Sequence, residues 1–290
     1  MLLQELYVRT RAVLERKLPY KEAVSFQQEK HQESIRSLIG AMSAQLPREE
    51  VEHHVSSIHN EAYIQIFSIE DIAEHIEHVR RLDAISSIMN HEDSHSTVTV
   101  LTHDAPFVLS NLCGVLSAND ANIFDAQIFT RDDGIVIDQF RVVNVATKSR
   151  LLDEQAGKIQ QDFDDVMQGN VSLEHLFEKH HRRWKRRPKP LFHPNIRIDV
   201  VFEDAPDYTI IDVYAPDTVG FLYKVTRTIS KLGLNIHFAK IATRVDGIVD
   251  SFYVHEQDGK PIRTDARKQE IKEKILHRIY QLINIQLSSQ

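Results

Sequence analysis

The chain contains an internal repeat, in which one pattern of residues recurs after 113 positions. The stretch NIFDAQIFT, from Asn122, is matched by NIHFAKIAT, from Asn235 (235 − 122 = 113). The match extends upstream to DAPFVLSNLCGVL and DTVGFLYKVTRTI, and downstream to RDDGIV and RVDGIV. Beyond these stretches the offset falls to 112, which pairs Asp138 with Asp250. A chain that repeats in this way is expected to fold as two similar units.

Each copy of the repeat has the same order of predicted elements. Alternating β-branched and aromatic residues in STVTVLTHD and in DYTIIDVYAPD predict a half-buried strand. After a short loop, apolar residues three and four apart predict a helix with one apolar stripe. Two strands follow, joined by a turn at Asp133-Gly134 or Asp246-Gly247, and then an amphipathic helix from about Ser149 or Asp265. The order β-α-β-β-α predicts an α+β fold, an antiparallel sheet with helices on one face, and residues 150–196 leave room for a further short strand.

These residues resemble the ACT domain, a small-molecule sensor module. The tandem pair, the basic segment HHRRWKRRPKPLFHP between its copies and the upstream IFSIEDIAEHIEHVRRL resemble the C-terminal regulatory region of the PII uridylyltransferase/uridylyl-removing enzyme family, over roughly residues 63–260. The resemblance implies two ferredoxin-like βαββαβ domains that sense an amino acid, glutamine, and so control PII uridylylation in nitrogen regulation. It implies PII or catalytic domains as partners, and a homo-oligomer is a further expectation.

Four segments are expected along the chain: helices over residues 1–92, a first ACT-like domain over 96–180, a basic linker and strand over 181–206, and a second ACT-like domain over 207–290. In the first segment, Pro47 suits a first helical turn. Ser68, with Glu70 and Asp71 close behind, is typical of a helix N-cap. The residues from Met89 to Ser96 are predicted to be a polar linker.

Composition excludes several classes of protein. With 42% hydrophobic and 27% charged residues the chain is globular, and it contains no apolar run of the roughly 20 residues that a membrane helix needs. Its first residues lack a secretory cleavage pattern, so we expect a cytoplasmic protein. The net charge of −7 argues against nucleic acid as a partner. The single cysteine, Cys113, is expected to be a packing residue, and no cofactor is expected.

Two histidine motifs suggest metal chemistry but lack its context. His91 to His95 spells H-E-x-x-H, which binds zinc only when a helix presents both histidines on one face. Here the neighbours are poor helix formers and a strand follows. His103-Asp104 resembles the ligand pair of an HD metal domain, but the repeat places it at the end of a strand. No catalytic motif is evident, and neither UMP transfer nor UMP removal is expected of this chain, although the resembled family is enzymatic.

The basic run from Lys179 to Lys189 holds seven positive residues around Trp184. RNA or an acidic patch on neighbouring domains would suit such a mixture, but a charge run is more often a solvated face, so a plain linker is the preferred interpretation. The histidine pairs His53/His54, His75/His78 and His180/His181 are expected on helix surfaces.

The loop after the first strand of each repeat is the predicted effector site. In the second copy it ends at a helix N-terminus, which can hold a carboxylate, and Gly220 permits close approach to the backbone. The amide of Asn235 can donate and accept, as an α-amino acid requires. The alternative is that Gly220 only relieves a turn and Asn235 only caps the strand. The resemblance favours a site formed by Asp217, Val219, Gly220, Phe221, Leu222, Asn235 and Ile236, with Asp104 and Asn122 from the first copy.

The first copy departs from the pattern because Phe107 stands at the position of Gly220 (220 − 113 = 107). A large side chain there can fill the space of a ligand, so the first repeat is expected to contribute its strand to a shared site. Phe107 also supports an alternative function, a ligand-free ACT module that mediates dimerisation or docking. Since neither loop contains a cation to pair with a second carboxylate, glutamine is expected to bind better than glutamate.

Overall fold

The structure, a computed structural model, describes residues 35–42, 46–58, 60, 62–184, 197–244 and 247–288, without the side chains of residues 179–184, 242–244 and 284–288. The chain divides into two compact units, Met1–Arg80 and Arg81–Gln290. The helix predicted near the N-terminus, residues 185–189 of the basic run and Asp246 of the second hairpin turn lie outside the described residues.

The first unit is helical over its described residues. Residues 35–42 form a helix, and α3 (Arg48–Ser56), α4 (Tyr63–Ile66) and α5 (Ile69–Arg80) follow. The predicted cap at the start of α5 is confirmed: the Ser68 hydroxyl accepts the Asp71 backbone N–H at 3.1 Å, and the Asp71 carboxylate accepts the Ser68 backbone N–H at 3.0 Å. This reciprocal pair fixes where α5 begins.

A buried polar group joins the helices of the first unit. The hydroxyl of Tyr63 lies 2.7 Å from Nε2 of His54 and 2.8 Å from Nδ1 of His75, so it can donate one hydrogen bond and accept the other. The exposed fractions of His54, Tyr63 and His75 are 1%, 1% and 2%. His54 and His75, which we predicted to be surface residues, are therefore core residues. Burial lowers the pKa of His75 to about 4, while the charge of Asp71 acts in the opposite direction.

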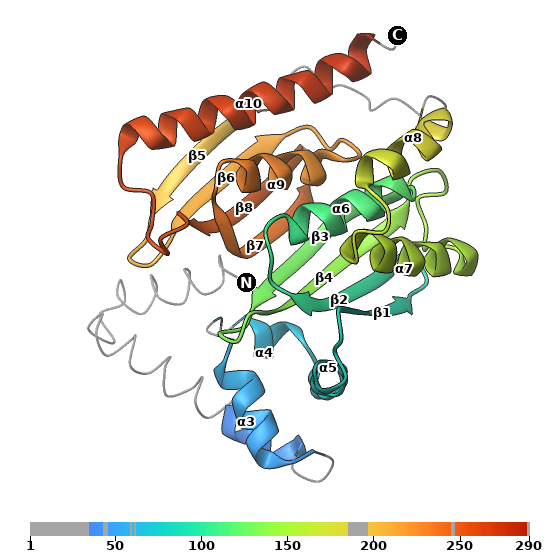
Figure 1. Cartoon of the computed structure of the whole chain (residues 1–290), viewed down its shortest axis with the longest axis vertical. Helices are drawn as coiled ribbons and strands as arrows, with labels where there is room; N and C mark the ends of the chain where they lie inside the picture. The colour runs from blue at the N-terminus through green and yellow to red at the C-terminus, as the bar shows by residue number, and fades with distance from the viewer. Residues whose placement is uncertain are drawn as a thin grey trace, which may run out of the picture. The chain divides into compact units, whose positions relative to one another are not determined.

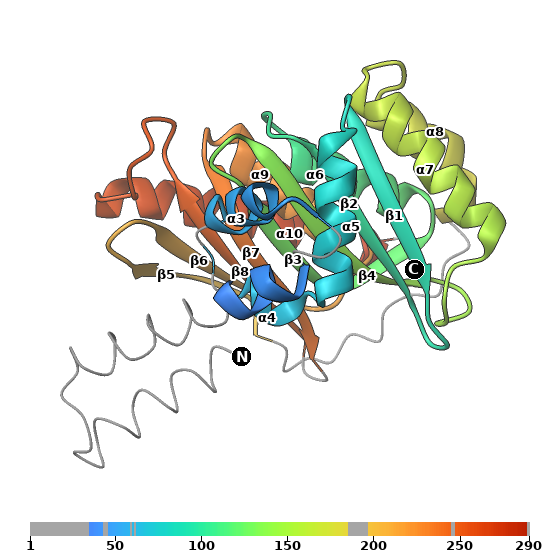
Figure 2. The same cartoon turned by 90° about the horizontal axis from the view of Figure 1, so that it is seen from below.

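The second unit contains one eight-stranded antiparallel sheet, in the order β1-β2-β4-β3-β7-β8-β6-β5 (Figures 1 and 2). Its strands are β1 (Ile85–His91), β2 (Ser96–His103), β3 (Ala121–Thr130), β4 (Ile135–Asn144), β5 (Asp199–Asp204), β6 (Thr209–Ala215), β7 (Asn235–Arg244) and β8 (Gly247–His255). Strands β1 and β5 form the two edges, as Figure 2 shows. The predicted α+β class with antiparallel sheets is confirmed.

The edge strands alter the expected boundaries and order. Residues 85–91, placed by the sequence in the helical segment and the polar linker, form β1, which pairs with β2 from Ile85↔Thr102 to His91↔Ser96. Residues 199–204 lie in the segment 181–206, which was expected to hold a basic linker and a strand, and they form β5, which pairs with β6. Each repeat therefore begins with its edge strand, where the βαββαβ order would place that strand last. The segment ISSIMNH shows no regular alternation of polar and apolar residues, which concealed β1; an edge strand pairs on one side only and tolerates such polar residues.

The two repeats join through the same strand of each copy. Strands β3 and β7 pair antiparallel, and Gln127 faces Lys240, its own repeat equivalent (240 − 127 = 113). Antiparallel pairing of equivalent positions relates the copies by an approximate two-fold axis. Each strand also carries an irregularity at an equivalent place, between Ile123 and Asp125 and between Ile236 and Phe238. Such bulges redirect the side chains at the start of a strand.

Helices cover one face of this sheet (Figure 1). They are α6 (Val108–Ala118), α7 (Asp153–Met167), α8 (Leu173–Trp184), α9 (Phe221–Lys231) and α10 (Asp265–Ser288). One continuous apolar cluster runs beneath them, from Val98 and Leu112 in the first repeat to Ile229 and Ile275 in the second. Cys113 is fully buried in it, in agreement with a packing role. Among the residues that the structure describes, no helix has the length and apolarity to cross a membrane.

Acid is expected to weaken the first unit through His75. The pKa of about 4 in the folded chain lies below the ordinary 6.5, so the folded state binds fewer protons, and stability present above pH 6.5 is lost as the pH falls toward 4. Between pH 7 and pH 5 the loss is about 2 kcal/mol. Hydrogen exchange of residues 69–80, corrected for intrinsic rates, should show it in the wild type and not in His75→Gln. The same pH dependence in both proteins would contradict this role.

Candidate functional site

The two loops that precede α6 and α9 have the same backbone conformation. Gly220 has φ 80° and Phe107 has φ 71°, both left-handed. In each loop the next residue closes a turn: Phe221 N–H donates to the Thr218 carbonyl at 2.9 Å, and Val108 N–H to the Ala105 carbonyl at 3.2 Å. Phenylalanine at such a φ carries strain that glycine does not. The fold therefore demands this conformation even where the residue opposes it.

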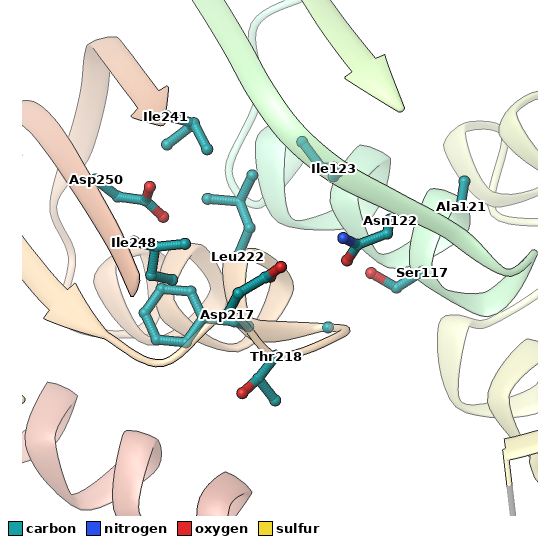
Figure 3. A pocket seen from close by; sticks show the side chains of 12 residues that line it. Ser117, Ala121, Asn122, Ile123, Asp217, Thr218, Leu222, Ile241, Ile248 and Asp250 are labelled. Carbon is teal, nitrogen blue, oxygen red and sulfur yellow. The ribbon is translucent and has the colours of Figure 1, made fainter. Parts of the chain in front are cut away.

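A pocket lies where the second repeat's loop meets the beginning of β3 from the first repeat (Figure 3). It has an empty volume of about 350 Å³, its mouth included. Polar and apolar side chains share the lining: Ser117, Ala121, Asn122 and Ile123 from the first repeat, and Asp217, Thr218, Gly220, Phe221, Leu222, Ile241, Ile248 and Asp250 from the second. The pocket thus requires both repeats, because neither copy supplies more than one side of it.

Asp217 and Asn122 face one another across the boundary between the repeats (Figure 3). Asp217 is exposed to solvent, yet the protein atoms around its carboxyl partly desolvate it and so raise its pKa. Lys148 and the side chain of Asn122 have the opposite, smaller effect and lower the pKa of the Asp217 carboxyl. Lys148 is thus a cation near this pocket that the loop sequences did not reveal. It sits in a turn whose Ala146 and Thr147 N–H groups donate to the Asn144 side chain.

The structure divides the predicted site residues into two groups. Asn122, Asp217, Gly220, Phe221 and Leu222 line the pocket, whereas Val219 does not and its neighbour Thr218 does. Asn235, which we predicted to act with Gly220, is exposed and lies outside the pocket. Asp104 and Ile236 also lie outside it. The two-fold relation explains why Asn122, and not Asn235, lies beside Gly220, because the loop of each repeat meets the strand of the other. At the equivalent position on the other side of the axis, Phe107 would lie beside Asn235.

Asp250 lines the pocket but was not predicted from the sequence, although the sequence carries a clear signal for it. It is 1% exposed and occupies β8 among apolar residues. The sequence shows an acidic residue at the same place in both repeats, on the strand face that Phe252 and Val254 continue. Burying a carboxyl on a core face costs free energy unless the carboxyl is hydrogen-bonded or paired, so its presence there is a signal of a possible functional role. Ser117, Ile241 and Ile248 join the pocket only through the pairing of β3 with β7, which the sequence does not specify.

Asp138, the counterpart of Asp250 in the first repeat, has a different environment. It is 0% exposed, and neither carboxyl oxygen has a hydrogen-bond partner. Burial raises the pKa of Asp138 well above its usual range, and the charge of Asp104 raises it further. At the corresponding loop, the guanidinium of Arg227 lies 5.9 Å from the centre of the Phe107 ring. The two halves of the sheet therefore share a backbone but present different chemistry at equivalent positions.

The histidine motifs lie on a β-hairpin. His91 ends β1, and the turn before β2 holds His95, whose Nε2 lies 3.3 Å from the Glu92 carboxylate. The helix that H-E-x-x-H needs is therefore absent at this motif. His103 ends β2, as the repeat predicted. Over the described parts of the chain, no three His, Cys, Asp or Glu side chains gather closely enough to hold a metal ion.

Comparison with known proteins confirms the resemblance. Residues 209–271 match the ACT domain family. The bifunctional uridylyltransferase/uridylyl-removing enzyme of Rhodospirillum rubrum is 29% identical over 294 residues, which cover 97% of this chain and 30% of that protein. Its namesake from Bradyrhizobium diazoefficiens is 33% identical over 180 residues, covering 62% of this chain and 19% of that protein. The chain thus spans less than a third of these relatives, and homology together with an ACT domain supports a regulatory region.

A structural comparison pairs the chain with an aspartate kinase from Synechocystis. The TM-score is 0.36 at 10% identity, over 64% of this chain and 27% of the kinase. At this score the likeness carries no argument.

Replacing Gly220 by alanine is expected to destabilise the protein by about 1–2 kcal/mol, because a Cβ strains the left-handed backbone. Gly157→Ala is the matched control, since Gly157 lies inside α7 with open space around an added Cβ. It should stabilise by about 0.5–1 kcal/mol. Urea unfolding measures both changes. Equal stability of the two variants would show that the loop does not need its left-handed residue.

Proposed function

We propose that this chain is the amino-acid-sensing part of a nitrogen-regulating uridylyltransferase system, and that its effector binds in the pocket between the repeats. The observation that carries the proposal is the joint lining: Asn122 of one repeat and Asp217 and Gly220 of the other meet in one cavity. The affinity of a ligand held by both copies depends on how the two copies are arranged as well as on the contacts within each copy. Such a ligand is suited to regulation, because it binds one arrangement of the two repeats better than another.

The polar end of the pocket suits the head group of an α-amino acid. Asp217 offers a carboxyl that accepts hydrogen bonds from an ammonium group, and the Asn122 amide can donate and accept. Helix α9 begins at Phe221 with no side chain capping it. The backbone N–H groups and dipole at such a helix end favour a carboxylate. Ammonium and carboxylate groups would thus each meet a group of complementary character.

The cavity must widen to admit an amino acid. The centre of a water molecule can move through only about 20 Å³ of it, room for one or two waters. Opening therefore has to move the loop from Asp217 to Gly220, and the glycine can change its backbone angles more freely than other residues. Ligand binding would then be coupled to a loop movement between the repeats. An allosteric coupling of about 1–3 kcal/mol is usual on this scale.

The relatives suggest what the sensor controls. Their names describe uridylyl transfer and uridylyl removal. We infer that glutamine bound here shifts the balance between uridylyl transfer to PII and uridylyl removal from PII. The partner of this chain would be the catalytic domains or PII itself. The neutral carboxamide distinguishes glutamine from glutamate, although Lys148 places a cation near the Asp217 end of the pocket.

A ligand-free interaction module is the second candidate function. Two observations favour it: the narrow cavity, and the strained Phe107 in place of a glycine. In that case the sheet and helices would serve to hold a second chain or a partner protein, and amino acids would not bind. Ligand-dependent stabilisation separates the two functions.

Glutamine at about 100 times its dissociation constant is expected to stabilise the wild-type fold by about 2.7 kcal/mol, seen as a higher melting temperature. Asn122→Ala should weaken binding by about 1–3 kcal/mol, because a ligand group loses its partner. Asn235→Ala is the matched control, since it removes the equivalent amide outside the pocket, and it should bind as the wild type does.

Calorimetry decides the outcome. If no standard amino acid binds to the wild-type chain, the sensor function fails and the interaction module replaces it. If Asn235→Ala weakens binding as much as Asn122→Ala does, the effector lies elsewhere.

A further inference from the structure

We propose that Asp250 determines which amino acid the pocket accepts, by favouring a side chain that ends in a neutral hydrogen-bond donor over one that ends in a carboxylate. This inference rests on the proposed function, since it assigns the selectivity of the same site. It depends on three features of the second unit: the place of Asp250 in the pocket, the apolar surface around it, and its contrast with Asp138.

The pocket has a polar end and an apolar end. Asp217, Asn122 and Ser117 lie together on one side in Figure 3, near the start of α9. Asp250 lies on the other side, among Ile241, Ile248 and Leu222. A ligand whose head group meets the first set would lay its aliphatic carbons along the isoleucine and leucine side chains. Its terminal group would then meet Asp250.

A carboxyl in apolar surroundings discriminates between terminal groups. In either protonation state Asp250 accepts a hydrogen bond from an N–H group, as a carboxamide provides. A ligand carboxylate at the same place would bring two carboxyl groups together, and such a pair needs a shared proton. With Asp250 only 1% exposed, water cannot relieve the repulsion. The terminal amide is therefore the better match.

Asp138 provides the internal comparison. It occupies the equivalent position (250 − 138 = 112), is equally buried and has no hydrogen-bond partner, yet it does not line the pocket. Burial raises the pKa of the Cys113 thiol on α6 well above its ordinary value, and the charges of Asp138 and Asp250 raise it further. The two carboxyls therefore lie near the same helix, and only one of them faces the cavity. A role in selectivity should belong to Asp250 alone.

The test is calorimetry with L-glutamine and L-glutamate on the full chain at pH 7.5. The wild type should prefer glutamine, and Asp250→Asn should lower the ratio of glutamine to glutamate affinity by at least about tenfold. Asp138→Asn, the matched control, should keep that ratio within about twofold. An unchanged ratio in Asp250→Asn, an equal loss for both ligands, or an equal change in Asp138→Asn would each overturn the inference while the sensor function stands.

A second measurement needs no variant and so does not depend on folding of Asp250→Asn. At pH 7.5 the wild type alone should bind L-glutamine at least about tenfold more tightly than L-glutamate. Equal affinities of the wild type for the two ligands would contradict the assignment. Binding of neither ligand would refute the sensor function and, with it, this inference.

Discussion

The antiparallel pairing of β3 with β7 is the interaction on which the second unit depends. It merges two four-stranded sheets into one and places Gln127 opposite Lys240, so the copies are related by an approximate two-fold axis. The axis brings the beginning of each strand beside the other repeat's loop. It also allows one apolar cluster to continue under α6 and α9. Without this pairing there would be no pocket, because its two sides come from different copies.

The sequence predicted the repeat, the α+β class, the Ser68 cap and the loop around Gly220, because each depends on local patterns. It did not predict that β3 and β7 pair, since the alternation in NIFDAQIFT fits either a central or an edge strand. Because of this pairing, Asn235 lies outside the pocket that Gly220 lines. Gly220 and Asn235 belong to the same copy, whereas the pocket joins the loop of one copy to the strand of the other, so Asn122 lines it and Asn235 does not. Strand β1 was missed because its polar residues resemble those of a linker, whereas a strand was expected within residues 181–206, where β5 lies.

Polar groups inside the apolar layers mark the places where the two copies diverged. Asp138 and Asp250 share a position, but one is sealed and the other lines a cavity. Phe107 and Gly220 share a left-handed backbone, and only the glycine adopts it without strain. Duplication supplied two equivalent places between the repeats, and these substitutions leave them chemically unequal. The proposed function, with one effector site in a symmetric sheet, rests on that inequality.

The central claim is that an amino acid binds between the repeats beside Asn122, and NMR of the isotope-labelled chain tests it directly. Addition of glutamine should shift the side-chain amide signals of Asn122 and the backbone signal of Gly220. The signals of their repeat equivalents, Asn235 and Phe107, should stay in place. Shifts confined to Asn235 and Phe107, or no shifts at all at saturating glutamine, would contradict the claim.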